Sequence, residues 1–271
     1  IYVSVVMLVV MFVAIRGRID EKSPIRIGTA FFCSNPFLNQ AGLNPVFVFF
    51  NSCLEKTNKD NDAISFMEDD IALRNVRKYF GMDDEKFSMS LERNISPDSL
   101  NNNDANIVLV IMESMSASKM GRYGSKMSMT PFLDSLANVS ISFNQIYTAG
   151  IHTYNGIYSS LFSFPALFML HPMKNADMKK YNGLSYWLRK SGYTNYFFTS
   201  HDGQFDNIEG FLMNNDFDRV YSKKDYPQEK ILSTLGVPDD YLLKYALKEI
   251  DDVGRTGKPF FAAILTSSDH G

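Results

Sequence analysis

Four polar side chains, each placed shortly after an apolar segment of this 271-residue sequence, have types that suit chemistry on an anionic ester: Glu113, Thr153, His201 and His270. A carboxylate such as Glu113 is a hard oxygen ligand for a divalent cation. A hydroxyl that coordinates the same cation can lose its proton and attack an ester as a covalent nucleophile. The two histidines can bind the substrate, protonate the leaving oxygen, or do both. The residue types therefore indicate metal-assisted transfer or hydrolysis, with Glu113 and Thr153 as metal ligands.

Each of these residues also has an ordinary structural interpretation. Thr153 lies near the first turn of a predicted helix, where unpaired amides and the helix dipole stabilise an anion. The same position suits a threonine that only caps the helix. Glu113 could likewise serve as a cap or a loop charge. Of the other two histidines, His152 lies beside Thr153, and the sequence does not give the direction of its side chain. His171, which precedes Pro172, is expected to have a structural role.

Strand and helix patterns alternate from residue 106 onward, which indicates an α/β fold with a mostly parallel sheet flanked by helices. The continuous β-branched run 107–112 is typical of a strand that is buried on both faces. The other predicted strands are 141–147, 193–199 and 259–265. Helices are predicted to begin at Pro131, with Phe132, Leu133 and Leu136 facing inward, and near Thr153, and to cover residues 184–192, 206–213 and 239–253.

This alternation positions the four polar residues. In open α/β sheets, ligands bind outside the carboxyl ends of the strands. Glu113, Thr153, His201 and His270 each follow a predicted strand, so all four are expected at that edge. One polar residue after a strand is ordinary, but a carboxylate, a hydroxyl and two histidines at one edge favour a functional site. They shift the interpretation of Thr153 from helix cap to nucleophile.

The amino-terminal part of the sequence predicts a membrane anchor and a connector. Residues 1–15 form an apolar run that is shorter than the roughly 20 residues a spanning helix needs. We expect it to be the end of a transmembrane helix that starts before residue 1; a buried core helix is the alternative. Residues 16–103 are expected to form a connector with helices, and 104–271 a catalytic domain whose carboxyl-terminal part lies beyond Gly271.

Composition and charge restrict the class of partner. A formal net charge of −3 gives no electrostatic basis for binding nucleic acid. Hydrophobic residues make up 45% of the chain, which is typical of a globular protein rather than a disordered one. Cys33 and Cys53 lie outside any CxxC pattern. The sequence is compatible with a disulfide between them and with two separate thiols in the core.

Five sequence motifs, in this order, resemble the sulfatase-like branch of the alkaline phosphatase superfamily, in particular the lipoteichoic acid synthase and phosphoglycerol transferase group. They are Leu-Val-Ile-Met-Glu-Ser at 109–114, Thr-Pro-Phe-Leu-Asp-Ser-Leu at 130–136, Gly-Ile-His-Thr-Tyr-Asn-Gly at 150–156, His-Asp-Gly at 201–203 and Leu-Thr-Ser-Ser-Asp-His-Gly at 265–271. The resemblance covers about residues 104–271. It implies an alkaline-phosphatase-like fold for this region.

The resemblance also implies roles for the site residues. Glu113 would be a ligand of a catalytic Mn or Mg ion, and Thr153 the nucleophile that takes up a phosphoglycerol group. His201 and His270 would line the substrate site. The implied enzyme is a membrane-anchored phosphotransferase that moves a phosphoglycerol-type group from a phospholipid to a glycan or glycerol acceptor through a phosphothreonine intermediate. A sulfatase-like hydrolase of phosphodiesters or sulfate esters, and a non-catalytic envelope protein, are the alternatives.

Three departures from the family pattern limit what the resemblance implies. The family completes its metal site with an Asp-His pair on a later strand, and Asp269-His270 is not that pair, so this piece is expected to be inactive by itself. Residues 205–210 lack the arginine that binds phosphate in phosphoglycerol transferases, which leaves the head group open. The residues around Thr153 also lack the Cys or Ser, Pro and Arg of formylglycine sulfatases.

The resemblance further implies a location. The family topology puts transmembrane helices first and the enzymatic domain outside the bacterial cytoplasmic (inner) membrane, on the periplasmic or extracellular side. Arg16 and Arg18 after the apolar run favour the opposite, a cytoplasmic position for that end of the helix. Two charges are weaker evidence than the topology of the family, so we expect the enzymatic domain on the outer side of the membrane.

Overall fold

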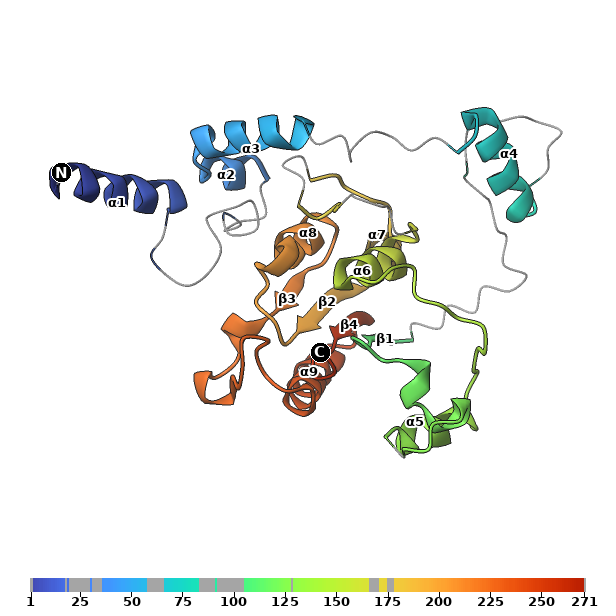
Figure 1. The fold of residues 1–271 in the computed structure, drawn as a ribbon. Helices are drawn as coiled ribbons and strands as arrows, with labels where there is room; N and C mark the ends of the chain where they lie inside the picture. Colours follow the sequence, from blue (N-terminus) through green and yellow to red (C-terminus); the bar gives the residue numbers. More distant parts are fainter. Residues whose placement is uncertain are drawn as a thin grey trace. The chain divides into compact units, whose positions relative to one another are not determined.

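The computed structural model describes residues 2–17, 19, 30, 36–57, 66–82, 91, 105–127, 129–165, 171–174 and 178–270 (Figure 1). The chain divides into two compact units. One comprises Ile1–Asn51 together with Ala105–Gly271, and the other comprises Ser52–Asp104. Cys33, on which the disulfide question depends, lies outside the described residues.

The amino-terminal part of the chain contains four helices among the described residues. They are α1 (Tyr2–Arg16), α2 (Pro36–Ala41), α3 (Pro45–Thr57) and α4 (Asp69–Tyr79). The expected helical run at the start of the chain is thus helical, and its apolar side chains from Tyr2 to Val13 are exposed. Within the part of the chain that the structure describes, no helix combines the length and apolarity needed to cross a bilayer.

A four-stranded sheet is the centre of the region after Ala105. Its strands are β1 (Ile107–Ile111), β2 (Thr194–Thr199), β3 (Arg219–Tyr221) and β4 (Phe260–Leu265), and their order in the sheet is β1-β4-β2-β3. All the pairings are parallel, which confirms the predicted α/β fold. β4 lies between two neighbours and all six of its residues are buried, as expected for a continuously apolar strand.

Helices cover both faces of this sheet (Figure 1). They are α6 (Thr153–Phe162), α7 (Leu184–Lys190), α8 (Ile208–Asn214) and α9 (Asp239–Gly254), whereas α5 (Pro131–Ala137) contacts the turn at Gly121–Tyr123. Because side chains alternate along a strand, Phe197 packs with α6 and α8 on one face and Phe198 packs with α9 on the other. Each such buried side chain contributes roughly 1.5–3 kcal/mol of hydrophobic stabilisation. Short 3-10 turns occur at Ala117–Lys119, Gly121–Tyr123, Phe205–Asn207, Lys223–Asp225 and Gln228–Lys230.

The prediction that the first strand is buried on both faces is wrong. The side chains of β1 alternate, and Val108 and Val110 are 51% and 43% exposed. The reason is its place at the edge of the described sheet. The opposite side chains of β1 pack in the core with α6, whereas α9 packs on β4 and β2.

The predicted strand at residues 141–147 is also absent from the described structure. The segment is an irregular, exposed stretch in which Ile141, Phe143 and Ile146 are 87%, 67% and 72% exposed. Strand propensity needs a partner edge and a surface to pack on, and no described strand pairs with this segment. Arg122 holds it instead, with its guanidinium donating to Ser142 Oγ at 2.5 Å and to Asn144 Oδ1 at 2.8 Å.

The inward-facing prediction for the helix at Pro131 is likewise wrong in part. Phe132 of α5 is 75% exposed and Leu136 is 44% exposed, whereas Leu133 is half-buried. Helical periodicity identifies an apolar stripe without showing what covers it.

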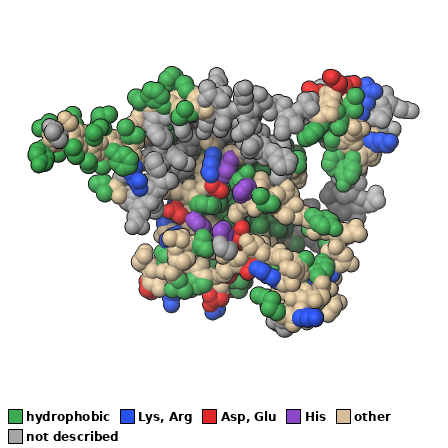
Figure 2. Space-filling model, in the orientation of Figure 1, with side chains coloured by type: hydrophobic (Ala, Val, Ile, Leu, Met, Phe, Trp, Pro, Cys, Tyr) green, Lys and Arg blue, Asp and Glu red, His purple; other side chains and the backbone are tan. Residues whose placement is uncertain are grey.

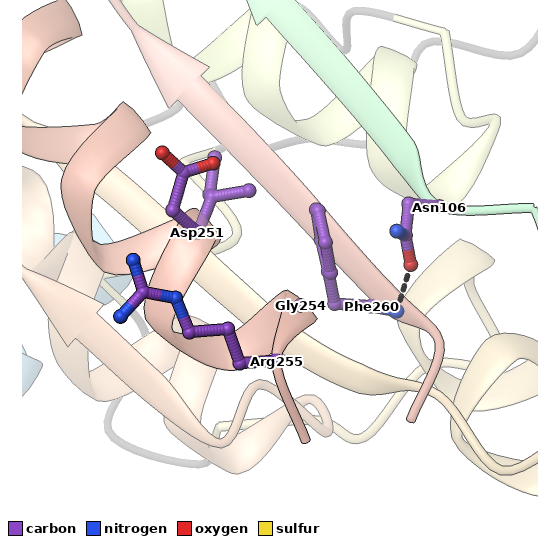
Figure 3. A pocket seen from close by; sticks show the side chains of 6 residues that line it. Asn106, Asp251, Gly254, Arg255 and Phe260 are labelled. Carbon is purple, nitrogen blue, oxygen red and sulfur yellow. Dashed lines mark hydrogen bonds between the residues drawn. The ribbon is translucent and has the colours of Figure 1, made fainter. Parts of the chain in front are cut away.

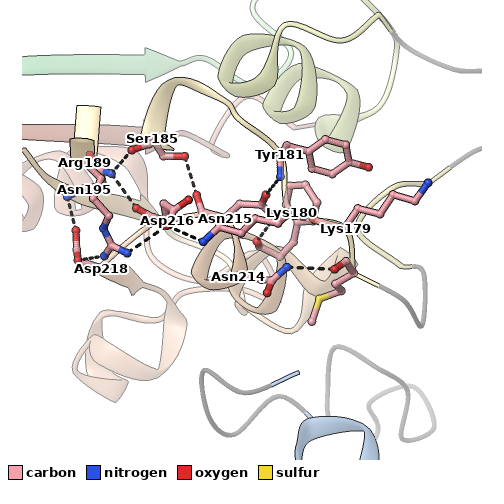
Figure 4. A network of polar contacts seen from close by, with 12 residues as sticks. Lys179, Lys180, Tyr181, Ser185, Arg189, Asn195, Asn214, Asn215, Asp216 and Asp218 are labelled. Carbon is pink, nitrogen blue, oxygen red and sulfur yellow. Dashed lines mark hydrogen bonds and ion pairs between the residues drawn. The ribbon is translucent and has the colours of Figure 1, made fainter. Parts of the chain in front are cut away.

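A buried polar network fixes the sheet to the helices on one face (Figure 4). The Asn195 side chain donates to the carbonyls of Ser185 and Asp216 at 2.7 and 2.8 Å. Asn215 donates to the Phe211 carbonyl at 2.9 Å and accepts from the Tyr181 amide at 2.7 Å. Hydrogen bonds between buried polar groups rigidify their surroundings. The network thus ties α7, β2 and the end of α8 into one scaffold.

Candidate active site

The carboxyl ends of the parallel strands bring the predicted site residues to one edge. Glu113 follows β1, His201 follows β2, and His270 lies on the loop after β4. Thr153 is the first residue of α6, which packs on the same sheet. The histidine side chains gather on one face, with lysine or arginine and acidic side chains among them (Figure 2).

Thr153 and Glu113 are in direct contact. The Thr153 hydroxyl donates a hydrogen bond to Glu113 Oε2 at 2.9 Å, although the residues lie 40 positions apart. Glu113 is fixed in turn, because its amide donates to Thr266 Oγ1 at 3.0 Å just after β4. The Thr266 amide donates to the Ile111 carbonyl at 3.1 Å, which continues the pairing of β1 with β4. The carboxylate is therefore held by the sheet and oriented toward the start of α6.

The alternative role of Thr153 as a helix cap is not what the structure shows. The N-cap of α6 is His152, which is extended at φ −106° and ψ 149°. The Asn155 side chain, which is buried, accepts from the His152 amide at 3.3 Å. Gly150 lies so close to Asn155 that an added Cβ would meet its Oδ1 at 2.6 Å, so a glycine is needed at this entry. Thr153 keeps its hydroxyl for Glu113, at the positive end of the helix.

His201 is partly buried at this edge. Its ring lies against Phe205 with centroids 4.4 Å apart, and its Nδ1 is buried. Burial lowers the pKa of His201 below its ordinary value, and the opposing effect of Asp202 is smaller. The imidazole is therefore neutral at pH 7 and can accept a proton or a hydrogen bond.

His201 is expected to titrate below its ordinary pKa of about 6.5 in a histidine NMR titration, with His201→Gln identifying its resonance. The linkage between proton binding and folding gives the direction in which stability changes with pH. The stability that neutral, buried His201 gives is complete above the unfolded-state pKa and is lost as pH falls through the lowered folded pKa. A resonance that titrates at or above pH 6.5 would contradict the burial argument.

His270 lies on the loop after β4, where its side chain is exposed. Its amide donates to the Ser267 carbonyl at 3.1 Å. The preceding residue, Asp269, pairs with Lys119 at 2.5 Å, which joins this loop to the one that carries Glu113. The structure thus joins Glu113 to Thr153 directly and places both histidines on the same edge, each on its own loop.

Sequence reasoning missed a second polar group beside Thr153. Tyr154 stacks on His171 with ring centroids 3.8 Å apart, and His152 stacks on the same tyrosine at 5.5 Å. His171 Nε2 lies 3.3 Å from Asp206 Oδ2, and Lys174 Nζ lies 2.6 Å from Asp206 Oδ1. Burial raises the pKa of Asp206, but His171 and Lys174 outweigh it and the net pKa is lowered. These contacts are compatible with the structural role expected of His171 and place it beside Thr153.

One local signal could have indicated this group. Asp206 and Asn207 have positive φ angles of 51° and 58°. Aspartate and asparagine tolerate this left-handed region better than other residues with a side chain. An Asp-Asn pair directly before an apolar helix is thus a turn signal, although nothing local shows that the turn reaches His171.

The donor set at Thr153 agrees in type with a hard divalent cation. A carboxylate and a hydroxyl oxygen, 2.9 Å apart, are the oxygen ligands that Mg²⁺ and Mn²⁺ favour. Within the described part of the chain, no group of three or more His, Cys, Asp or Glu side chains is arranged to hold a metal ion. Glu113 and Thr153 therefore fit part of a metal site.

A cavity of about 390 Å³ lies elsewhere, lined by Asn106, Ile250, Asp251, Gly254, Arg255 and Phe260 (Figure 3). Asn106 precedes β1 and Phe260 begins β4, so the cavity is at the amino ends of these strands. The Asn106 side chain accepts from the Phe260 amide at 3.1 Å and is occupied in holding the sheet. This cavity is therefore at the opposite end of the strands from Glu113.

Comparison with known proteins agrees with this geometry. The family model described as Sulfatase matches residues 105–271. A crystal structure of a protein in the alkaline phosphatase superfamily from Vibrio parahaemolyticus is 28% identical, with a TM-score of 0.57 over 62% of this chain and 41% of that one. The lipoteichoic acid synthase LtaP from Listeria monocytogenes is 22% identical, with a TM-score of 0.59 over 73% of this chain and 47% of that one. The chain thus spans less than half the length of either structure.

Proposed function

Because this chain belongs to the sulfatase family, we propose that it is part of a membrane-anchored, metal-dependent phosphotransferase. The enzyme would move a phosphoglycerol-type group from a phospholipid to a glycan or glycerol acceptor. The observation that carries the proposal is the hydrogen bond from the Thr153 hydroxyl to Glu113 Oε2 at the start of α6. It gives a nucleophile, an acceptor for its proton and a helix end that stabilises an anion.

In the first step, Thr153 Oγ1 attacks the phosphorus of the donor. A bond forms between this oxygen and phosphorus, and the bond from phosphorus to the diacylglycerol oxygen breaks. The proton of Thr153 passes to Glu113, and the leaving oxygen takes a proton from His270. The product of this step is a phosphothreonine diester at position 153 that keeps the glycerol group.

In the second step, an acceptor hydroxyl attacks the phosphorus of phosphothreonine. The proton of that hydroxyl passes to the histidine that lost one, and Thr153 leaves and regains its proton from Glu113. Burial keeps His201 neutral at pH 7, so it can orient the attacking hydroxyl by accepting its hydrogen bond.

A divalent cation, Mn or Mg, would have Glu113 and Thr153 among its ligands and would supply charge neutralisation and activation of the hydroxyl. Glu113 has a separate task that the described residues support by themselves. Its hydrogen bond fixes the rotamer of the Thr153 side chain, so that the nucleophilic oxygen is oriented before substrate binds.

The proposal extends to location and partners. The protein would be anchored in the bacterial cytoplasmic (inner) membrane through the segment that contains α1, with the catalytic domain on the outer side. The exposed apolar side chains of α1 support contact with lipid. A phospholipid or another phosphodiester would be the donor, and nucleic acid is not a partner.

The test is to trap the intermediate in the full-length protein. The protein is incubated with Mn²⁺ and phosphatidylglycerol labelled in its head group, quenched with acid and digested for mass spectrometry. We expect the label as a phosphoglyceryl group on the peptide that contains Thr153, and none in Thr153→Ala. Thr130→Ala is the matched control, because Thr130 also donates to a carboxylate, Asp134, at 3.1 Å.

The products of the same reaction distinguish the alternatives. A labelled glycan or glycerol product indicates transfer, whereas free glycerol phosphate indicates that water is the acceptor and the enzyme is a hydrolase. Turnover by Thr153→Ala at the wild-type rate would remove the nucleophile and the proposal with it.

A further inference from the structure

Lys174 is the centre of a polar group whose chemistry the proposed reaction does not use. Its ammonium lies 2.6 Å from Asp206 Oδ1, and its side chain is 50% exposed while that of Asp206 is 13% exposed. An ammonium has three N–H donors, so one ion pair leaves donors directed to solvent. The buried carboxylate thus holds a cation whose outer side is open to a ligand.

The group lies beside the nucleophile. Tyr154 directly follows Thr153, and its ring stacks on His171, which contacts the same Asp206 carboxylate at 3.3 Å. Lys174 is therefore connected to Tyr154, at the start of α6, through three successive side-chain contacts. In the space-filling view, a basic side chain lies among the histidines on this face (Figure 2).

The backbone next to Lys174 is held in place by the turn at Asp206 and Asn207. Asn207, which is buried, donates from its side chain to the Met173 carbonyl at 2.7 Å. Asp206 and Asn207 both adopt left-handed backbone conformations, which persist where the surroundings impose them. The turn thus clamps the 171–174 segment at two consecutive residues, through a backbone carbonyl and an ammonium.

Other lysines at this edge have different uses. Lys119 pairs with Asp269, and Lys223 donates to the carbonyls of Ser233 and Thr234 at 3.3 and 3.4 Å. Lys174 differs because its carboxylate partner also contacts a histidine that is stacked against the residue after the nucleophile.

We propose that Lys174, oriented by Asp206 and His171, binds a non-bridging oxygen of the anionic ester group that Thr153 attacks. The inference rests on the proposed function, because it needs an anionic ester at Thr153. Lys174 would offset the negative charge of a phosphate or sulfate ester by a charge-assisted hydrogen bond. Asp206 and His171 are positioning residues that act through Lys174.

The test uses full-length Thr153→Ala, which cannot turn over a bound ester by the proposed route. Binding of glycerol phosphate is measured by isothermal titration calorimetry, with inorganic sulfate as a second probe that separates the two ester classes. Losing one hydrogen bond between charged groups is expected to weaken glycerol phosphate binding about tenfold to hundredfold in Lys174→Met. Lys174→Arg should keep most of the affinity, because it retains the charge.

Lys224→Met is the matched control. Lys224 pairs with Glu209 at 2.5 Å, with side-chain exposures of 62% and 16%, so the pair has nearly the geometry of Lys174 and Asp206. Its removal should leave binding unchanged. Glycerol phosphate binding in Lys174→Met equal to that in Lys224→Met would overturn the inference, as would failure of Thr153→Ala itself to bind the probe.

The two proposals fail in different ways. Thr153→Ala with wild-type turnover defeats the nucleophile, whatever Lys174 does. Loss of turnover in Thr153→Ala, together with unchanged affinity in Lys174→Met, defeats the assignment of Lys174 alone. A loss of sulfate affinity larger than the loss of glycerol phosphate affinity would instead indicate a sulfate ester as the substrate class.

Discussion

Replacing Glu113 with glutamine in the full-length enzyme is expected to lower turnover by about 10²- to 10⁴-fold, the usual effect of removing a general base. The glutamine keeps the shape of the side chain and the backbone hydrogen bond to Thr266. It loses the charge that accepts the Thr153 proton and that would bind a divalent cation. The measurement is steady-state release of diacylglycerol from labelled phosphatidylglycerol, with the unfolding temperature recorded for each variant.

Asp134→Asn is the control for this experiment. Asp134 is another carboxylate that accepts from a threonine hydroxyl, that of Thr130, at 3.1 Å, and it lies on α5. Its loss should change turnover little. An equal fall in both variants would mean that Glu113 acts on folding, and normal turnover in Glu113→Gln would remove it from the reaction.

Gly236→Ala is expected to destabilise the chain by about 4 kcal/mol, in the range reserved for severe backbone effects. Gly236 has a φ of +97°, and an added Cβ would lie 1.8 Å from the Ser200 carbonyl oxygen. That contact is with backbone, so no side-chain rotation relieves it. The free energy of unfolding in urea measures the effect.

Gly192→Ala separates the clash from the backbone angle. Gly192 has a similar φ of +88°, but an added Cβ would meet nothing within 4 Å. Its cost should be about 1 kcal/mol, from the left-handed conformation alone. If both variants lose the same free energy, close packing of Gly236 on Ser200 is not what makes glycine necessary there.

The sequence predicted the strands β1, β2 and β4 of the sheet but not the short strand β3. β4 was expected from an unbroken apolar run and is buried at all six residues. The failures occur where a pattern needs a partner that local sequence does not specify. Residues 141–147 have strand propensity without a strand beside them among the described residues, and Phe132 forms part of an apolar stripe that is exposed.

The residues of the candidate site also differ in whether local sequence could predict them. Glu113 could be predicted, because it follows an apolar strand whose end marks the edge of the sheet. Thr153 was expected at that edge for a wrong reason, since the strand predicted before it is absent from the described residues and α6 brings it there. Lys174 and Asp206 could not be predicted, because they meet through a turn of left-handed residues that local patterns do not place in space. Their pairing depends on the packing of the whole domain.

The strand order has a consequence for the folding of this chain. β4 is the last of the four strands in the sequence, yet it lies between β1 and β2. The hydrogen bond that fixes Glu113 joins its amide to Thr266 Oγ1, 153 positions away along the chain. Contacts of such long range form late in folding, after the entropy of closing the intervening loop has been overcome. In a nascent chain, Thr153 is therefore synthesised well before β4 can hold Glu113 in place, so we expect the proposed reaction only after β4 has inserted between β1 and β2.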